Sequence, residues 1–248
     1  MIGQIFNIIL YQPLFNALIF LYEYLPGKDF GIAVIILTIL IKFLLYPLGT
    51  QAIKSQKAMQ EIQPQLKEIQ EKYKNDSKAK AEATMELYKK TKINPFSGFL
   101  SLFIQIPILF ALYRIFWKGL NPQELTNLYS FIPNSGSIDP TFLNFINLAN
   151  PNIYLAVLAG VFQFIQTKMT TPKKQQAQSS KSGVPDFSQM MQKQMLYFFP
   201  VFTIFILWKL PSALALYWII TSIFTIVQQY LTLKPRTEAK LGTGQERI

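Results

Sequence analysis

The sequence predicts an all-α fold, a polytopic helical membrane protein with five transmembrane helices, a cytoplasmic helical hairpin and an N-terminal interfacial helix. Half of the 248 residues are hydrophobic, and only 15% are charged. Several apolar stretches reach about 20 residues, the length at which a helix crosses a bilayer core. A soluble domain of this size carries more charge, so the composition indicates that most of the chain lies in a membrane.

Residues 1–28 contain the predicted interfacial helix and the turn that ends it. Gln12, Asn16 and Glu23 fall on one face of an otherwise apolar helix. Pro13 interrupts the helical pattern near its middle. This combination favours a helix that lies on the outer membrane surface, with a complete span as the alternative.

The first predicted span, residues 29–49, contains the stretch GIAVIILTILIKFLLYPL, in which Lys42 is the one charged residue. A helix of this length covers roughly 27 Å, about one bilayer core. A charge near the centre of a span costs about 2.5–3.5 kcal/mol. Such a lysine either extends its ammonium to the headgroups or lines a wet cavity, and the sequence leaves both interpretations open.

Residues 50–94 form the predicted cytoplasmic hairpin, where the polarity of the chain changes sharply. Ile62, Leu66 and Ile69 recur at helical spacing, with charged residues interleaved three and four apart. The triplet Asn75-Asp76-Ser77 is a turn and N-cap signal for a second helix at Lys78–Thr91. The pattern fits a solvated pair of charged helices and also a surface on which partners dock.

The remaining segments alternate between predicted spans and polar connections. They are a span at 95–120, an extracytoplasmic loop at 121–151, a span at 152–169, a cytoplasmic loop at 170–194, spans at 195–209 and 212–231, and a basic cytoplasmic tail at 232–248. Lysine and arginine are concentrated in the hairpin, the second polar loop and the tail, whereas the 121–151 loop has neither. The positive-inside rule therefore predicts a cytoplasmic C-terminus and, with five spans, an N-terminus outside. This asymmetry also explains most of the net charge of +11.

Polar side chains within the predicted spans form the candidate site. They are Thr38, Lys42, Tyr46, Ser101, Gln105, Gln163, Gln166, Tyr217, Thr221 and Gln228. Most lie in the cytoplasmic half or near the middle of the membrane, which predicts a polar groove that is open to the cytosol and closed outside. The simpler interpretation is that glutamine and threonine form hydrogen bonds between helices, worth about 0.6 kcal/mol each.

The sequence contains neither cysteine nor histidine, and this excludes several kinds of chemistry. Disulfides, thiol nucleophiles, Ser-His pairs and cysteine or histidine metal sites are all removed. No GxxxxGK[ST] or GxGxxG motif is present, so no nucleotide, cofactor or metal is expected. A membrane-embedded enzyme is disfavoured on these grounds.

Several stretches, taken together in this order and spacing, carry a family resemblance. They are YQPLFNALIFLY at Tyr11–Tyr22, GIAVIILTILIKFLLYPL with the lysine-rich SQKAMQEIQPQLKEIQEKY after it, INPFSGFLSLFIQIPILFALYRIF at Ile93–Phe116, and LPSALALYWIITSIFTIVQQYL at Leu210–Leu231. With them the chain resembles the YidC/Oxa membrane protein insertase family in its minimal five-span form. In that family an arginine on the first span gives the groove its positive charge. Lys42 stands at this position, which keeps the charge but loses the bidentate fork.

The resemblance implies a function, a location and partners. It implies an insertase of the bacterial inner (plasma) membrane that receives nascent transmembrane segments in a hydrophilic groove and releases them sideways into lipid. Nascent membrane proteins and the bilayer are the implied partners, and the SecYEG translocon and the ribosome are candidates through the basic hairpin and tail. The alternative is a small channel or secondary transporter, which would predict an inverted repeat and paired broken helices. A purely structural scaffold leaves Lys42 without an explanation.

Overall fold

The computed structural model describes residues 2–94, 100–118, 121–133, 136–170 and 194–234, and most of them are helical. In chain order the elements are α1 (Ile2–Phe6), η1 (Asn7–Tyr11), α2 (Gln12–Tyr24), η2 (Pro26–Lys28), α3 (Phe30–Leu44), α4 (Tyr46–Glu61), α5 (Gln63–Lys72), α6 (Ser77–Thr91), α7 (Leu100–Lys118), η4 (Pro122–Asn127), β1 (Thr141–Phe142), β2 (Ile146–Asn147), α8 (Ile153–Thr170), η6 (Gln194–Phe198), α10 (Phe199–Leu207) and α11 (Ser212–Leu233). The predicted helical class is confirmed, and the short ribbon β1–β2 is an addition to it.

Two helical runs in the described part of the chain are long and apolar enough to cross a membrane. They are Gly3–Tyr24 and Ser212–Leu233, each of 22 residues. α3 and α4 together form a third candidate, with a bend of 66° between them. α8 and α10 are apolar but shorter. The count of five spans, their boundaries and their sidedness stay predictions, and most of the predicted cytoplasmic loop and tail lies outside the described residues.

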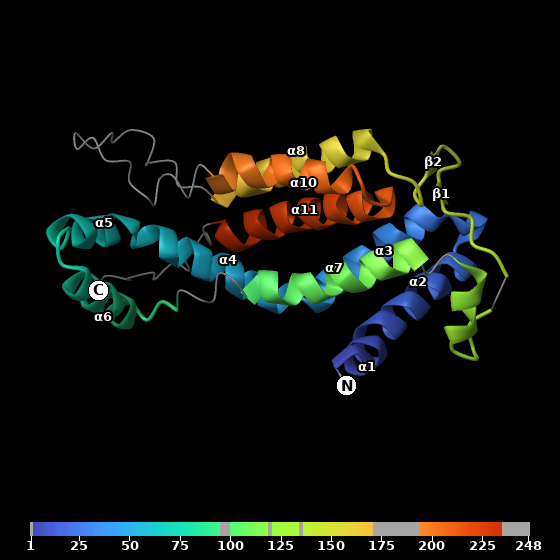
Figure 1. Cartoon of the computed structure of the whole chain (residues 1–248), viewed down its shortest axis with the longest axis horizontal. Coiled ribbons are helices and arrows are strands. Elements are labelled where there is room, and N and C mark those ends of the chain that lie inside the picture. Colours follow the sequence, from blue (N-terminus) through green and yellow to red (C-terminus); the bar gives the residue numbers. More distant parts are fainter. Residues whose placement is uncertain (1, 95–99, 119–120, 134–135, 171–193, 235–248) are drawn as a thin grey trace, which may run out of the picture.

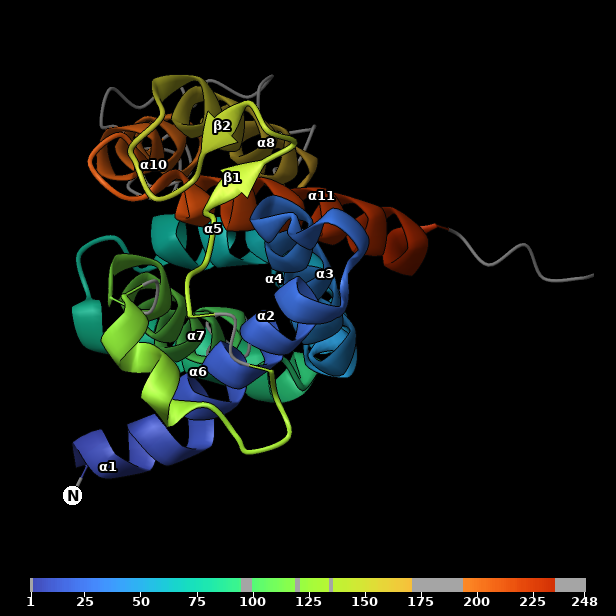
Figure 2. The same ribbon diagram turned by 90° about the vertical axis from the view of Figure 1, so that its right-hand side faces the viewer.

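The long helices lie roughly side by side in a bundle (Figure 1), and α11 is at its centre. α11 packs against α8 on one side and against α3 and α4 on the other, while α10 packs on α8. The view along the bundle shows α11 between these two groups (Figure 2). α5 and α6 lie at one end of the bundle, and β1–β2 lies at the other. Polar side chains on α11 therefore face helices from both halves of the chain.

The first predicted span is broken near its end. α3 ends at Leu44, and α4 begins at Tyr46 with Pro47 in its first turn. Proline has no N–H, and its ring excludes the carbonyl four residues earlier from the helical ladder, but the residue is well suited to the start of a helix. Within the predicted span at 29–49, Pro47 therefore stands at the start of a second helix that runs off at an angle of 66°.

A glycine sets the close contact between α8 and α10. A β-carbon at Gly160 would collide with the side chain of Ile204 and approach the carbonyl oxygen of Pro200 to 3.1 Å. α10 itself is only 9 residues long. Because Gly160 has no side chain, the short apolar helix α10 can pack closely against α8.

The N-terminal helix carries its polar face inward. Asn16 is buried, its side-chain amide donates to the carbonyl of Asn127 at 3.4 Å, and its Oδ1 accepts from the backbone N–H of Tyr129 at 2.7 Å. Ile8 and Ile9 are exposed on the outside of the helix. Asn16, one of the polar residues that suggested a water-facing surface, therefore holds the loop after α7, whereas Glu23 pairs with Lys28 at 2.7 Å.

The segment between α7 and α8 fastens the ends of α3 and α11 together. One oxygen of Asp29 caps α3 by accepting from the N–H of Ile32 at 2.8 Å, and the other accepts from the N–H of Leu143 at 2.6 Å. The N–H groups of Ser212 and Ala213 donate to carbonyls of the same segment. These bonds close the end of the bundle that carries β1–β2.

α5 and α6 pack against each other at the opposite end of the bundle. Asp76, within the predicted N-cap triplet, caps α6 by accepting from the N–H groups of Lys78 and Ala79, and the helix begins at Ser77, one residue before the predicted start. The location of this helix pair on the cytoplasmic side stays a prediction.

Candidate functional site

The predicted site residues come from five helices of the bundle. Thr38 and Lys42 lie on α3, Tyr46 on α4, Ser101 and Gln105 on α7, Gln163 and Gln166 on α8, and Tyr217, Thr221 and Gln228 on α11. Because α11 contacts α3, α4, α7 and α8, it is the element that brings them together. The side chain of Ser101 lies outside the described residues.

Two of the predicted glutamines pair with aromatic side chains of α11. The amide nitrogen of Gln105 donates to the hydroxyl of the buried Tyr217. The indole N–H of Trp218 donates to Oε1 of Gln163 at 2.9 Å. The sequence did not indicate Trp218, although an indole N–H inside a span needs an acceptor. The two bonds connect α11 to α7 and to α8.

A third glutamine connects α11 to the bend between α3 and α4. Gln228 is 2% exposed, and its Nε2 donates to the carbonyl of Tyr46 at 2.8 Å and to the hydroxyl of Thr50 at 3.1 Å. A β-carbon at Gly49 would lie 2.9 Å from both polar atoms of this amide, so the glycine leaves room for it. Thr50 was missed because it belonged to the predicted soluble hairpin. We call the polar contacts of α11 with α4, α7 and α8, together with Lys42 of α3, the α11 seam.

Lys42 is the cation of the α11 seam. Its side chain is half-buried, and its Nζ lies 5.8 Å from the centroid of the Phe224 ring on α11. Within the described ranges it makes no hydrogen bond or ion pair. Phe224 also packs edge-on against Phe43 and Tyr46. The ammonium thus rests on an aromatic face with no carboxylate partner, in position to attract an anionic group.

The other predicted residues differ in whether their side chains have a hydrogen-bonding group left free for a ligand. Thr38 is 1% exposed, and its hydroxyl donates to the carbonyl of Val34 in its own helix at 2.6 Å, so it presents no free group. Gln166 is half-buried on α8. Thr221 and the unpredicted Gln229 each have a buried side-chain oxygen without a hydrogen-bond partner in the described part of the chain. Buried oxygens of this kind are ready to accept a bond.

An open pocket of about 370 Å³ lies away from these residues, beside the N-terminal helix. Among the described residues no group of acidic side chains is arranged to hold a metal ion. The described residues of the α11 seam provide one positive charge, at Lys42, together with amide groups, hydroxyl groups and aromatic faces.

Comparisons with known proteins give consistent matches. The family model described as 60Kd inner membrane protein matches residues 20–240. The chain is 38% identical over 208 residues to the membrane protein insertase YidC of Fusobacterium nucleatum, covering 83% of this chain and 87% of that protein. It is 36% identical over 219 residues to the protein of the same name from Syntrophus aciditrophicus and 34% identical over 218 residues to that from Geobacter metallireducens. These two alignments cover 88% of this chain but only 35% of each relative.

Proposed function

The chain belongs to the 60Kd inner membrane protein family, and from this membership we propose that it is a membrane protein insertase. The resemblance noted in the sequence is confirmed. The family and the apolar helices indicate a bacterial inner membrane protein. In the proposed activity, the α11 seam receives a nascent transmembrane segment and releases it sideways into lipid without hydrolysing a nucleotide. The protein carries out no covalent chemistry in this scheme.

The observation that carries the proposal is the ammonium of Lys42, which has no ion-pair partner among the residues that the structure describes. A nascent helix gains free energy by entering lipid, but its polar flank must cross first. A carboxylate about 4 Å from an ammonium is attracted by about 4 kcal/mol at an effective dielectric constant near 20, against about 1 kcal/mol in water. Lys42 thereby lowers the barrier for an acidic flank at the stage where it has left bulk water.

Hydrogen-bonding groups of the seam support the same step for uncharged flanks. The unpartnered oxygens of Thr221 and Gln229 can accept from the backbone N–H groups of a substrate. The bonds of Gln105 to Tyr217 and of Gln163 to Trp218 are weak enough, at about 0.6 kcal/mol in a membrane, to be exchanged for substrate bonds. A polar segment thus finds partners partway across the bilayer.

The short helix α10 reduces the remaining distance. α10 has 9 residues and the π-helical turn η6 before it has 5, so their described part rises roughly 21 Å. A bilayer core is about 30 Å thick and thins around short apolar helices at modest cost. Burial of the apolar part of the substrate then drives the step.

The proposal includes a sidedness and a set of partners. The end closed by the Asp29 bonds is the outer end, which leaves the N-terminus outside and the C-terminus in the cytoplasm. α5 and α6 then lie in the cytosol, where their lysines can contact nascent chains, the ribosome or the SecYEG translocon. The full arrangement is the five-span one predicted from the sequence.

Reconstitution of the purified chain into liposomes tests the function. The substrate is a short single-span protein with an acidic N-terminal flank, and insertion is scored by protection from added protease. We expect protection only in liposomes that contain the chain, with no release of an entrapped ionic dye. Dye release without insertion would contradict the proposal and favour the channel or transporter.

A further inference from the structure

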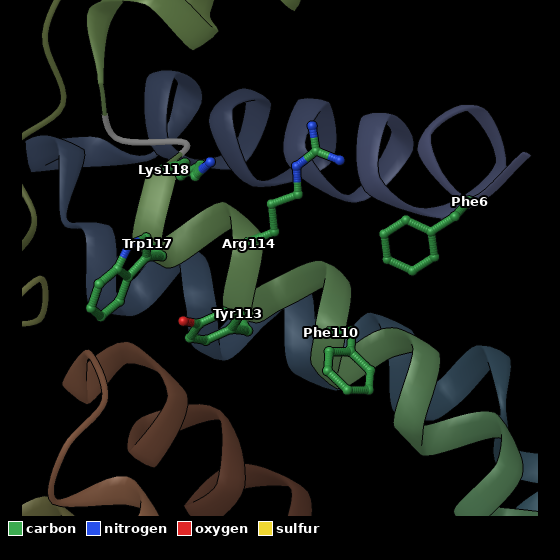
Figure 3. A pocket seen from close by; sticks show the side chains of 6 residues that line it. All are labelled: Phe6, Phe110, Tyr113, Arg114, Trp117 and Lys118. Atoms are coloured by element: carbon green, nitrogen blue, oxygen red, sulfur yellow. The ribbon is translucent and has the colours of Figure 1, made fainter. Parts of the chain in front are cut away.

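The open pocket beside the N-terminal helix has a composition that the insertase proposal does not use. Figure 3 shows the six residues that line it, one from α1 and the others from the last turns of α7: Phe6, Phe110, Tyr113, Arg114, Trp117 and Lys118. Phe110 is 62% exposed and Trp117 is 55% exposed. The pocket therefore combines uncovered aromatic surface with two cations.

The lining is ordered along the axis of α7. Phe110, Arg114 and Lys118 are four residues apart and share one face of the helix. Tyr113 and Trp117 flank that face, with their rings 5.8 Å apart. α7 runs towards the end of the bundle that carries β1–β2, so the two cations lie nearer that end and Phe110 lies deeper (Figure 1). An amphiphile with its polar group outward would match this order.

The two cations have no carboxylate partner in the part of the chain that the structure describes. The guanidinium carbon of Arg114 lies 4.2 Å from the centroid of the Tyr11 ring. The nearby carboxylate of Glu124 accepts at Oε2 from the Tyr11 hydroxyl at 3.0 Å and from the Asn127 amide at 3.3 Å, and it forms no ion pair with Arg114. Like charges four residues apart on a helix repel each other, so an anion between Arg114 and Lys118 would be stabilising.

We propose that this pocket binds one anionic glycerophospholipid, with the phosphate on Arg114 and Lys118 and an acyl chain along Phe110 and Phe6. The ring of Tyr11 supports the guanidinium of Arg114, whose fork of N–H groups matches two phosphate oxygens. Tryptophan and tyrosine beside it are the residues typical of the membrane interface. A free phosphate would leave the aromatic lining uncovered, and a zwitterionic headgroup would bring its own ammonium next to the arginine.

The bound lipid would join α1 to α7, and this inference does not rest on the insertase proposal. Native mass spectrometry of the full chain in non-ionic detergent tests it by counting retained lipids during titration with phosphatidylglycerol or phosphatidylcholine. We expect preferential retention of one phosphatidylglycerol. Arg114→Gln should weaken that retention roughly tenfold, and Arg114→Lys should weaken it less because the charge remains.

Lys209→Gln is the matched control, because Lys209 is another exposed cation that lies over an aromatic ring, 5.0 Å from the centroid of Trp208. It should leave phosphatidylglycerol retention unchanged. Equal retention by the parent and Arg114→Gln would overturn the proposal, as would equal retention of the two lipids. Displacement of the lipid by millimolar inorganic phosphate would also overturn it, because it would identify a site for free anions.

Discussion

Replacing Lys42 with alanine should slow the insertion of a substrate with an acidic flank and leave a substrate with a neutral flank nearly unaffected. The ammonium of Lys42 has no carboxylate partner in the described residues and lies 5.8 Å from the Phe224 ring centroid. Because the side chain is only half-buried, solvent screening reduces its attraction for a carboxylate to about 1–2 kcal/mol. This corresponds to a rate of insertion about 5- to 30-fold lower.

The assay measures initial rates of protease protection in liposomes for four variants and for substrates with acidic, neutral and lysine flanks. Lys42→Arg should keep most of the rate, and Lys42→Glu should fall below Lys42→Ala on the acidic flank but recover with a lysine flank. Lys234→Ala is the control, because Lys234 is also a lysine near an aromatic ring, 6.0 Å from the centroid of Tyr230. An equal loss on acidic and neutral flanks would refute the electrostatic reasoning, since a packing defect does not distinguish them.

Three substitutions test how the bundle is held together, each by thermal unfolding in detergent. Asp29→Ala removes the cap of α3 and the acceptor for the loop, so the melting temperature should fall by an amount that corresponds to about 1–2 kcal/mol, with Asp29→Asn intermediate. Gly160→Val should lower the free energy of unfolding by about 2 kcal/mol or more, because the new side chain collides with α10. Gly3→Ala should change it little, because a β-carbon there meets nothing within 4 Å. Gln228→Leu should cost about 1 kcal/mol because the carbonyl of Tyr46 loses a donor, and amide exchange at the start of α4 should rise. An unchanged melting temperature in any of the three would show that the contact in question is not stabilising.

Local signals predicted much of the fold. Apolar runs indicated the helices, and Asp76 indicated the start of α6, because both depend on neighbours within a few residues. The inward face of the N-terminal helix was not predictable in this way. Asn16 contacts residues more than 100 positions away, and periodicity carries no information on which polar face meets which loop. The ribbon β1–β2 was also missed, since its turn at Leu143 and Asn144 lacks the glycine that usually indicates a hairpin.

The candidate site was predictable as a set of residue types but not as a set of pairs. Polar residues in apolar helices are conspicuous, so Gln105, Gln163 and Gln228 were found from the sequence. Tyr217 and Tyr46 were in the predicted set too, but the partners Trp218 and Thr50 were missed, because a tryptophan or a threonine at a helix end has many possible roles. The structure turns these glutamines towards partners on neighbouring helices, whereas Lys42 has no hydrogen-bond or ion-pair partner in the described part of the chain, and this distinguishes the two kinds of polar residue.

The most direct test of the central claim is photocrosslinking between the α11 seam and a substrate arrested during insertion. Benzoylphenylalanine would replace Phe224, the ring on which Lys42 rests, and in a second variant it would replace Val161, an exposed residue of α8. If the seam receives the nascent segment, the crosslinked product forms from position 224 and is weak or absent from position 161. Crosslinking from position 161 without crosslinking from position 224 would contradict the account, because the substrate would then pass along a different surface of the bundle.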